Sequence, residues 1–356
     1  MELRTLDDAG AGRWDAFLAQ RPDGLVYQSW RYGRMLRAVL PEAEPCYLAA
    51  VQGDDIVGVL PCFMSAPGPC GPVLNSLPFF GSHGGVLAAD DAPEAADFLL
   101  RGLDELARAR GCASATVITS PFESRLDRYE AFFPDALRDQ RISMVTPLPG
   151  DAPDVEEALF ARFHSIRRND IRRAQRAGVR VRRADDEATA AFLARAHGLS
   201  MTAIGGLPKP DSFYRALFAA LRPGQDWSLY AADLDGTTVA ALLVLHWGDT
   251  LEYFVPAILA EHRNTQAMAL AIYTAMVEGT RRGFRRWNWG GTGLTMDGVY
   301  HFKSKWGTRE GRYHYFTRLY PEGRPLLEMP PARILAAYPW FFTLPFHALA
   351  AARAEV

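Results

Sequence analysis

The feature that most constrains the fold of this chain is a repeated pattern of two apolar runs joined by a polar turn. The first copy covers residues 47–60, and the second covers residues 230–243, which begin 183 positions later. Each copy has a glycine, Gly53 or Gly236, where a tight turn between antiparallel strands requires a positive φ angle. The sequence therefore predicts two copies of one β-hairpin.

The segments around the two hairpins also correspond. Two helical patterns precede each hairpin, and a longer helical pattern closed by glycine follows it and leads into an apolar strand. The first half has helices at 14–20, 29–40 and 92–110 and a strand at 113–119; the second has helices at 187–203, 211–221 and 266–282 and a strand at 286–290. Each half thus combines helices with a mixed sheet, and the predicted fold class is mixed α/β (α+β) in two similar domains.

A stretch rich in proline and glycine, residues 147–153, separates these halves. It lies between a strand at 142–146 and a charged helix that begins near Val155. The predicted domains are residues 1–150 and 151–325, followed by a C-terminal helical extension at 326–356.

Composition excludes several classes of protein. The 356 residues contain 39 Lys and Arg against 41 Asp and Glu, so the net charge of -2 creates no large field toward nucleic acid or anionic membrane, and any basic site must be local. The four cysteines form no CxxC pair and have no histidine cluster beside them, so we expect no metal site and no disulfide framework. A reducing compartment agrees with this cysteine usage.

The two ends of the sequence bear on localisation. The charged N-terminal residues lack the apolar core of a secretory signal, so we expect a cytoplasmic protein. Residues 334–352 contain no Asp, Glu, Lys or Arg, but Pro339 and Pro345 argue against a membrane-spanning helix. We predict short helical pieces packed on the protein, and leave open a peripheral contact with the inner face of the membrane. That contact would use the aromatic residues Trp340, Phe341, Phe342 and Phe346.

The densest charge feature is a run of nine arginines in 22 residues. It has two interpretations. The guanidinium groups can bind phosphate oxygens of a substrate or of an RNA backbone. Alternatively, the run is a solvated helix face that nearby carboxylates such as Asp170, Asp185 and Asp186 partly neutralise. The nine are Arg162, Arg167, Arg168, Arg172, Arg173, Arg176, Arg180, Arg182 and Arg183.

A second motif, residues 298–307, interleaves aromatic residues with Lys303 and Lys305 after a glycine-rich strand end. A lysine held beside aromatic rings can present its charge to an oxygen that becomes more negative in a transition state. The alternative is an amphipathic turn whose lysines extend to solvent.

Together with the run Arg167-Arg168-Asn-Asp-Ile171, this motif resembles the FemAB/FemX-like family of tandem GNAT-fold N-acyltransferases, which includes the BioF2-like acetyltransferase domain. The segment 27–30, the loop 78–85 and the doubled hairpin extend the resemblance over residues 14–320. The resemblance implies two tandem GNAT-like domains, each a mixed sheet flanked by helices, with the acceptor on the first domain and the donor on the second.

The resemblance also implies transfer of an acyl or aminoacyl group to a primary amine of a cell-envelope precursor, an amino sugar or a peptide, without a bound cofactor or metal. Lys303 and Phe302 would lie at the donor site, where the lysine would assist the oxyanion. Glu252, Tyr253 or His83 could accept the proton of the amine. For His83 a hydrogen bond to backbone is the simpler expectation, and Glu252 could equally be a solvated strand residue. The remaining substrate-binding candidates are Tyr27, Trp30, Phe80, Ser82, Arg167, Arg168, Tyr300 and Lys305.

The identity of the donor remains open at this point. Enzymes of this superfamily that use CoA have a glycine-containing loop at the start of their long helix, because bare backbone N–H groups bind the pyrophosphate. Here Thr265 stands at the glycine position. This departure favours aminoacyl-tRNA as co-substrate. The alternatives are an acyl-CoA-dependent N-acetyltransferase of the BioF2-like type and a non-catalytic scaffold that binds a phosphorylated ligand.

Overall fold

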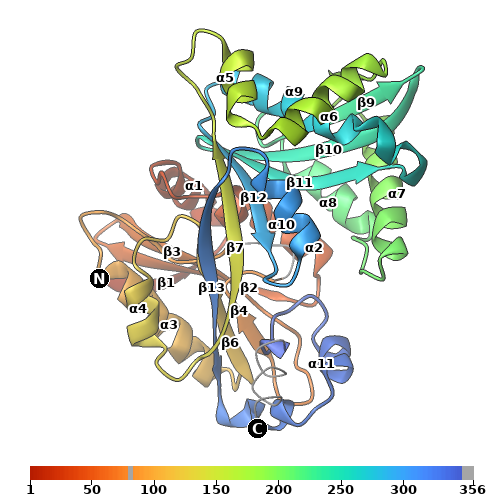
Figure 1. The fold of residues 1–356 in the computed structure, drawn as a ribbon. Coiled ribbons are helices and arrows are strands. Elements are labelled where there is room, and N and C mark those ends of the chain that lie inside the picture. Colours follow the sequence, from red (N-terminus) through yellow and green to blue (C-terminus); the bar gives the residue numbers. More distant parts are fainter. Residues whose placement is uncertain (79–82, 347–356) are drawn as a thin grey trace. The chain divides into compact units, whose positions relative to one another are not determined.

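The computed structural model describes residues 1–78 and 83–346 (Figure 1). Two compact units make up the chain: Met1–Arg141 with the described part of Arg312–Val356, and Ile142–Gly311. The chain leaves the first unit within β7 (Leu137–Pro147) and returns within β13 (Arg309–Leu319). This division differs from the predicted boundaries near residues 150 and 325, because β13 pairs with β6 (Ser114–Ile118) and so adds a strand to the first unit's sheet.

The sheet of the first unit contains the first predicted hairpin, β2 (Glu44–Gln52) and β3 (Asp55–Met64), which pair antiparallel around Gly53 at a φ of 62°. The strand β4 (Val73–Asn75) runs parallel to β6, and the short β5 (Leu87–Ala88) pairs with β3. With β1 (Glu2–Leu6) at its edge, the order is β1-β2-β3-β4-β6-β13.

Successive side chains of each strand point to opposite faces of this sheet, and helices pack on both faces. In β2, Leu48 joins the core beneath α3 (Ala95–Ala109), whereas the ring of Tyr47 lies against Trp14 and Trp30. Those two tryptophans belong to α1 (Ala11–Ala19) and α2 (Trp30–Val39). The short α4 (Leu126–Phe132) packs beside α3.

The sheet of the second unit has the order β7-β12-β11-β10-β9-β8. Its second predicted hairpin is formed by β9 (Trp227–Leu234) and β10 (Thr237–Trp247), with Gly236 at a φ of 78°. The remaining strands are β8 (Arg180–Arg183), β11 (Thr250–Ile258) and β12 (Arg286–Thr292), and of these β11 and β12 run parallel. The predicted mixed α/β fold class is confirmed.

The long helix α9 (Ala267–Arg281) packs on β9, β10 and β11, with α5 (Val155–Arg162) and α6 (Ser165–Arg176) beside it (Figure 1). Leu242 and Val244 of β10 share its buried core. The helix α7 (Glu187–Ala203) also packs on β10 and β11 and contacts α8 (Asp211–Ala220). The helix α10 (Asp297–Ser304) follows β12 and carries the motif that the sequence singled out.

After β13 come two short helical segments, η4 (Pro321–Leu327) and α11 (Pro331–Ala337), and residues 338–345 are not helical. The aromatic residues beyond them pack on the first unit: the ring of Phe342 lies 5.0 Å from that of Tyr315, and the Asn75 side chain makes hydrogen bonds of 2.8 Å to both the N–H and the C=O of Phe342. No helix within residues 1–78 and 83–346 has the length and apolar character needed to cross a membrane.

Candidate active site

The parallel strands β11 and β12 separate soon after they begin. Their ladder joins residues 250–252 to residues 286–288 and ends there, whereas the ladder of β11 with β10 continues to Ile258. Beyond Asn288 the register of β12 with β7 shifts, and Gly290 takes a φ of 66° in this shift, which glycine adopts without strain. The edge of β11 beyond Glu252 is therefore not used by β12, and its backbone groups can bind the amide or carbonyl of a ligand.

Glu252 and Asn288 face each other at the last pair of this ladder. The Asn288 amide donates to both oxygens of the Glu252 carboxylate at 3.1 and 3.0 Å, and its own oxygen accepts from the backbone N–H of Gly290 at 3.1 Å. Glu252 is 1% exposed, so the open alternative of a solvated strand residue is wrong. The pair holds the two strands together at the point where they begin to separate.

Lys303 is buried against the end of β12. Its Nζ donates to the carbonyl oxygen of Gly291 and to the hydroxyl of Thr292, both at 3.1 Å, and the residue is 6% exposed. Burial lowers the pKa of Lys303 from 10.5 to about 8, because the charged form loses hydration. Because water does not screen a buried ammonium, the ammonium interacts with a nearby negative charge more strongly than an exposed lysine does. The alternative that Lys303 extends to solvent is wrong.

Aromatic rings surround this lysine's helix. The ring of Trp289 lies 4.9 Å from Tyr253, 5.6 Å from Trp306 and 6.1 Å from Phe302. Thr146 accepts a hydrogen bond from the Trp289 indole at 2.9 Å and donates to the Trp306 carbonyl at 3.0 Å. Burial raises the pKa of Tyr253 well above its usual value, so this phenol stays protonated at neutral pH. The rings form an apolar support beside Lys303.

Arg167 contacts the same aromatic group. Its guanidinium carbon lies 4.8 Å from the centre of the Phe302 ring, and the side chain forms an ion pair of 2.8 Å with Asp170. Burial lowers the pKa of Arg167, opposed by the charge of Asp170. Arg168, in contrast, borders an opening of about 330 Å³ that is also lined by Glu156 and Glu157. The role of both arginines as phosphate contacts stays a prediction.

Two further candidates lie on or next to α10. The Tyr300 hydroxyl donates to a Glu310 carboxylate oxygen at 2.9 Å. Lys305 is half-buried just after the helix, and its carbonyl accepts the backbone N–H of His164 at 3.0 Å. All eight donor-side candidates belong to the second unit, and ring contacts link Tyr253, Phe302 and Arg167 through the aromatic group. Arg168 lies at a separate opening. The eight are Lys303, Phe302, Glu252, Tyr253, Tyr300, Lys305, Arg167 and Arg168.

The acceptor-side candidates belong to the first unit. His83 is fully buried, with its ring 5.8 Å from Tyr27 and 4.5 Å from Tyr313, and burial lowers its pKa to about 3. The Trp30 indole donates to Asp8 at 2.9 Å and lies within the core. Phe80 and Ser82 lie outside the described residues.

The start of α9 is the place where this fold presents backbone N–H groups to a phosphate. There the Thr265 hydroxyl donates to the carbonyl of His262 at 2.7 Å and accepts from the N–H of Ala267 at 3.3 Å. The intervening Gln266 has a φ of 61°. The Thr265 hydroxyl therefore already accepts a hydrogen bond from the Ala267 N–H, one of the groups that would otherwise bind a pyrophosphate.

Sequence reasoning missed two residues of this group, Asn288 and Thr292. The sequence does contain a signal for the first, because Asn288 is a polar residue between two tryptophans on a predicted strand and must find a buried partner. Nothing in the pattern points to Thr292. Among residues 1–78 and 83–346, no three His, Cys, Asp or Glu side chains are grouped to hold a metal ion.

The parallel strands β11 and β12, which separate beside the long helix α9, and the buried Lys303 all lie within residues 161–304. Residues 161–304 match the family model for the acetyltransferase (GNAT) domain, so this segment belongs to that family. No curated protein matches the chain at a significant level.

Solved structures show the fold of the whole chain. FemX has 17% identity and a TM-score of 0.72, over 92% of this chain and 99% of its own. A domain of a putative lysylphosphatidylglycerol synthetase from Agrobacterium fabrum has 12% identity and a TM-score of 0.59, over 92% and 96%. A tandem GNAT protein from the clavulanic acid biosynthesis pathway has 14% identity and a TM-score of 0.51, over 89% and 98%. The predicted FemX-like tandem GNAT fold is confirmed.

Proposed function

We propose that the chain transfers an aminoacyl group from tRNA to a primary amine of a cell-envelope precursor, an amino sugar or a peptide. The amine nitrogen attacks the ester carbonyl, a C–N bond forms, the C–O bond to the ribose breaks, and the proton lost by the amine ends on the ribose hydroxyl. The atoms balance without any further reactant.

Lys303 supplies the charge that this reaction needs. When the amine attacks, the carbonyl oxygen becomes an oxyanion, and a buried ammonium group stabilises such charge far more than water-exposed lysine does. The hydrogen bonds of Nζ to Gly291 and Thr292 orient the ammonium before the reaction begins. Phe302 contributes packing, and Glu252 is proposed as the proton acceptor, reached through the edge of β11.

The observation that carries the choice of donor is the hydroxyl of Thr265 on the N–H of Ala267. Because this N–H already has a partner, the first turn of α9 offers less to a CoA pyrophosphate than a glycine loop would. An aminoacyl ester needs no pyrophosphate site. The name of a structurally similar lysylphosphatidylglycerol synthetase likewise refers to an aminoacylated product, in that case a lipid.

An acyl-CoA donor is the second candidate. It is supported by the match of residues 161–304 to the acetyltransferase (GNAT) domain, and by the similar clavulanic acid pathway protein, whose description mentions AcCoA.

The test is a donor panel: purified protein, a set of amine acceptors, and either aminoacyl-tRNA or acyl-CoA, with products identified by mass spectrometry. Lys303→Met should lower turnover by about a hundredfold or more with the true donor. Thr265→Gly should increase the affinity for CoA, while Thr265→Ser, which keeps the hydroxyl, should behave as the wild type.

Product from charged tRNA alone supports the proposal. Product from acyl-CoA alone, with no effect of Thr265→Gly, refutes the donor argument and favours the second candidate. No product from either donor, together with binding of a phosphorylated ligand, leaves a scaffold.

A further inference from the structure

The nine clustered arginines separate into two groups. One group has fixed protein partners: Arg167 pairs with Asp170, Arg182 with Asp186 and Asp233, and Arg183 with Asp185 and Glu278, while Arg162 donates to the Pro147 carbonyl. These four arginines therefore contribute to the fold, and neutralisation by carboxylates, which the sequence left open, applies to Arg167, Arg182 and Arg183.

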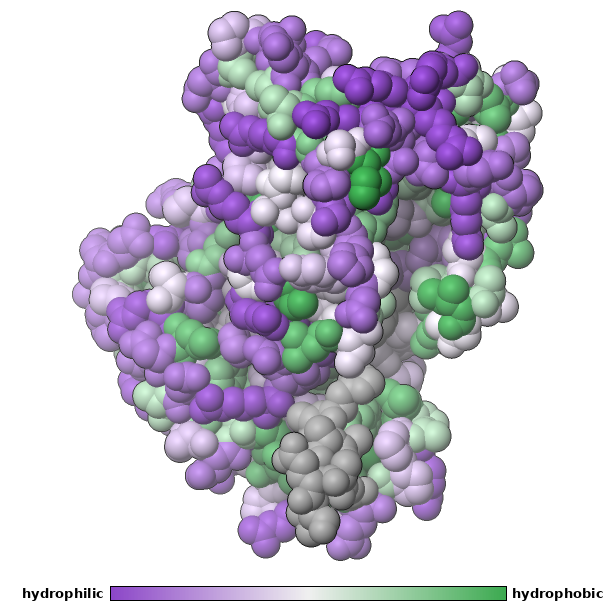
Figure 2. Space-filling view, viewed as in Figure 1, coloured by the Kyte–Doolittle hydropathy of each residue, from purple (hydrophilic) through white to green (hydrophobic). Residues whose placement is uncertain are grey.

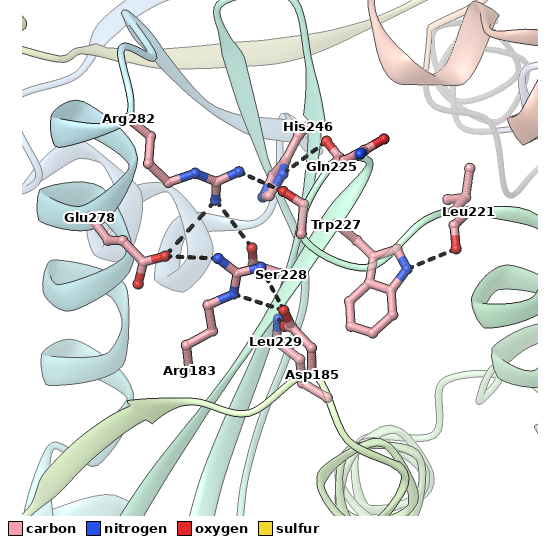
Figure 3. Close-up of polar contacts among 11 residues, drawn as sticks. Arg183, Asp185, Leu221, Gln225, Trp227, Ser228, Leu229, His246, Glu278 and Arg282 are labelled. Carbon is pink, nitrogen blue, oxygen red and sulfur yellow. Dashed lines mark hydrogen bonds and ion pairs between the residues drawn. The ribbon is translucent and has the colours of Figure 1, made fainter.

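Figure 3 shows how thoroughly Arg183 is engaged. Its guanidinium contacts Asp185 at 2.6 Å and Glu278 of α9 at 3.3 Å, and Asp185 in turn accepts the backbone N–H of Leu229 at 2.7 Å. Arg282 joins the same network through the Glu278 carboxylate at 3.9 Å, and it also donates to the Ser228 hydroxyl at 3.3 Å and to the Gly224 carbonyl at 2.7 Å. The network connects β8, β9 and α9, and none of its arginines is available to a ligand.

The other five arginines form what we call the arginine surface: Arg168, Arg172, Arg173, Arg176 and Arg180. Within residues 1–78 and 83–346, no carboxylate lies within 4.0 Å of any of their guanidinium nitrogens. All except the half-buried Arg168 are exposed. Figure 2 shows the corresponding hydrophilic area over the helix labelled α6 in Figure 1.

The arrangement of this surface fits a strand of phosphates better than a single phosphate. Arg168, Arg172 and Arg176 repeat every four residues on one helix face and extend over about 12 Å, and Arg180 follows at the start of β8. Single phosphates need one or two such groups, whereas a nucleic-acid backbone presents phosphates in succession.

A membrane surface fits less well. A helix that lies in a bilayer interface exposes an apolar face between its cations. In α6 the apolar residues Ile171 and Ala174 are fully buried in the core of the unit. One large apolar residue, Ile166 at the start of the helix, is exposed, and the other exposed positions are Ser165, Asn169, Gln175 and arginines, so the helix has no continuous apolar face toward solvent. The exposed face of α6 therefore suits a polyanion in water better than insertion into lipid.

We propose that the arginine surface binds the phosphate backbone of the tRNA that carries the acyl group. This inference rests on the proposed tRNA donor. It assigns the recognition of that donor to α6 and the start of β8, elements distinct from those that hold Lys303.

The test measures the affinity of the full chain for fluorescently labelled tRNA between about 50 and 200 mM salt. The test variant combines Arg173→Gln, Arg176→Gln and Arg180→Gln, because these side chains have no fixed partner and lie away from Glu156 and Glu157. The control combines changes of three exposed arginines of the first unit that also lack a carboxylate partner: Arg101→Gln, Arg324→Gln and Arg333→Gln.

Both triple variants change the net charge by the same amount. We expect the test variant to reduce the slope of log affinity against log salt by about 2 and to weaken binding by about tenfold or more, and the control to leave both unchanged. Equal behaviour of the two variants overturns the inference. A second assay measures sedimentation of the same proteins with vesicles made of equal parts of phosphatidylglycerol and phosphatidylcholine. If the test variant loses vesicle binding but keeps the tRNA affinity of the wild type, the inference is also overturned, and the arginine surface binds a membrane instead.

The two proposals fail in different ways. If the wild type transfers from charged tRNA and the test variant binds tRNA normally, the donor stands and the inference is overturned. If tRNA binding depends on the arginine surface but acyl groups come from acyl-CoA alone, the surface stands and the proposed donor is refuted.

Discussion

Burial of the Lys303 ammonium predicts a specific dependence of stability on pH. The folded chain releases this proton near pH 8, whereas an exposed lysine in the unfolded chain releases it near 10.5. Between these values the unfolded chain binds more protons, so the free energy of unfolding rises with pH. Below pH 8 the cost of burying the charge is fully present.

The size of the effect follows from the two pKa values. At about 1.4 kcal/mol per pH unit, a difference from 10.5 to about 8 is worth about 3 kcal/mol in total, of which about 2.5 kcal/mol is gained between about pH 7 and 10. Lys303 is 6% exposed, so solvent screening takes little away from this figure.

The assay compares urea unfolding of the wild type and of Lys303→Met across this pH range. The variant lacks the titrating group, and every other titration cancels in the difference between the two proteins. We expect the wild type to gain about 2.5 kcal/mol relative to the variant between about pH 7 and 10.

A difference that stays constant within about 0.5 kcal/mol over this range refutes the reasoning. It would mean that Lys303 keeps an ordinary pKa and that its ammonium is hydrated in the folded chain. A buried Lys303 charge could then not be the source of oxyanion stabilisation, and inactivity of Lys303→Met would need another cause.

Three further substitutions test packing and polar contacts, one in the second unit and two in the first. Glu252→Ala leaves the buried Asn288 amide without its acceptor and should lower the free energy of unfolding by about 2 kcal/mol in urea titrations, whereas an unchanged value would show that the pair holds nothing together. Asp104→Asn removes a carboxylate that accepts from Arg108, Arg318 and Tyr320; burial raises its pKa, but these three donors outweigh burial and hold the pKa below 3.8. The variant should be less stable than the wild type at neutral pH in thermal unfolding, and this difference should vanish as pH falls through the lowered pKa. A difference that persists below that pKa would show that the ionised carboxylate is not what stabilises these contacts. Gly84→Ala would place a Cβ 1.7 Å from the carbonyl oxygen of Ser76 and should cost about 2 kcal/mol or more, so a thermal midpoint equal to that of the wild type would contradict this close approach of the two backbone segments.

Local patterns were sufficient to predict much of the fold. The hairpins around Gly53 and Gly236 form where the glycines allow positive φ, and the helical periodicity before and after them locates α3 and α9 within a few residues. These features depend on neighbours in the sequence, so they can be read without the structure. The motif around Lys303 is also visible in the sequence, but whether the lysine is buried or extends to solvent stayed open until the structure showed its contacts with Gly291 and Thr292.

Contacts between distant segments decided the rest. The sequence contains nine arginines in one run, and only the folded chain separates the four with fixed protein partners, such as Arg183 with Glu278, from the five of the arginine surface. The division of the chain at β13 depends on pairing with β6, nearly 200 residues earlier in the chain. Glu252 is buried because Asn288 of another strand satisfies both of its oxygens.

The sequence by itself therefore determined the two-fold α/β plan and the lysine motif, since turn geometry, helical periodicity and local burial act over a few residues. The tertiary structure alone decided which polar side chains have partners. Whether a charge is neutralised or available depends on carboxylates and carbonyls that the fold brings within about 3 Å from elsewhere in the chain, and a linear pattern carries no record of these approaches.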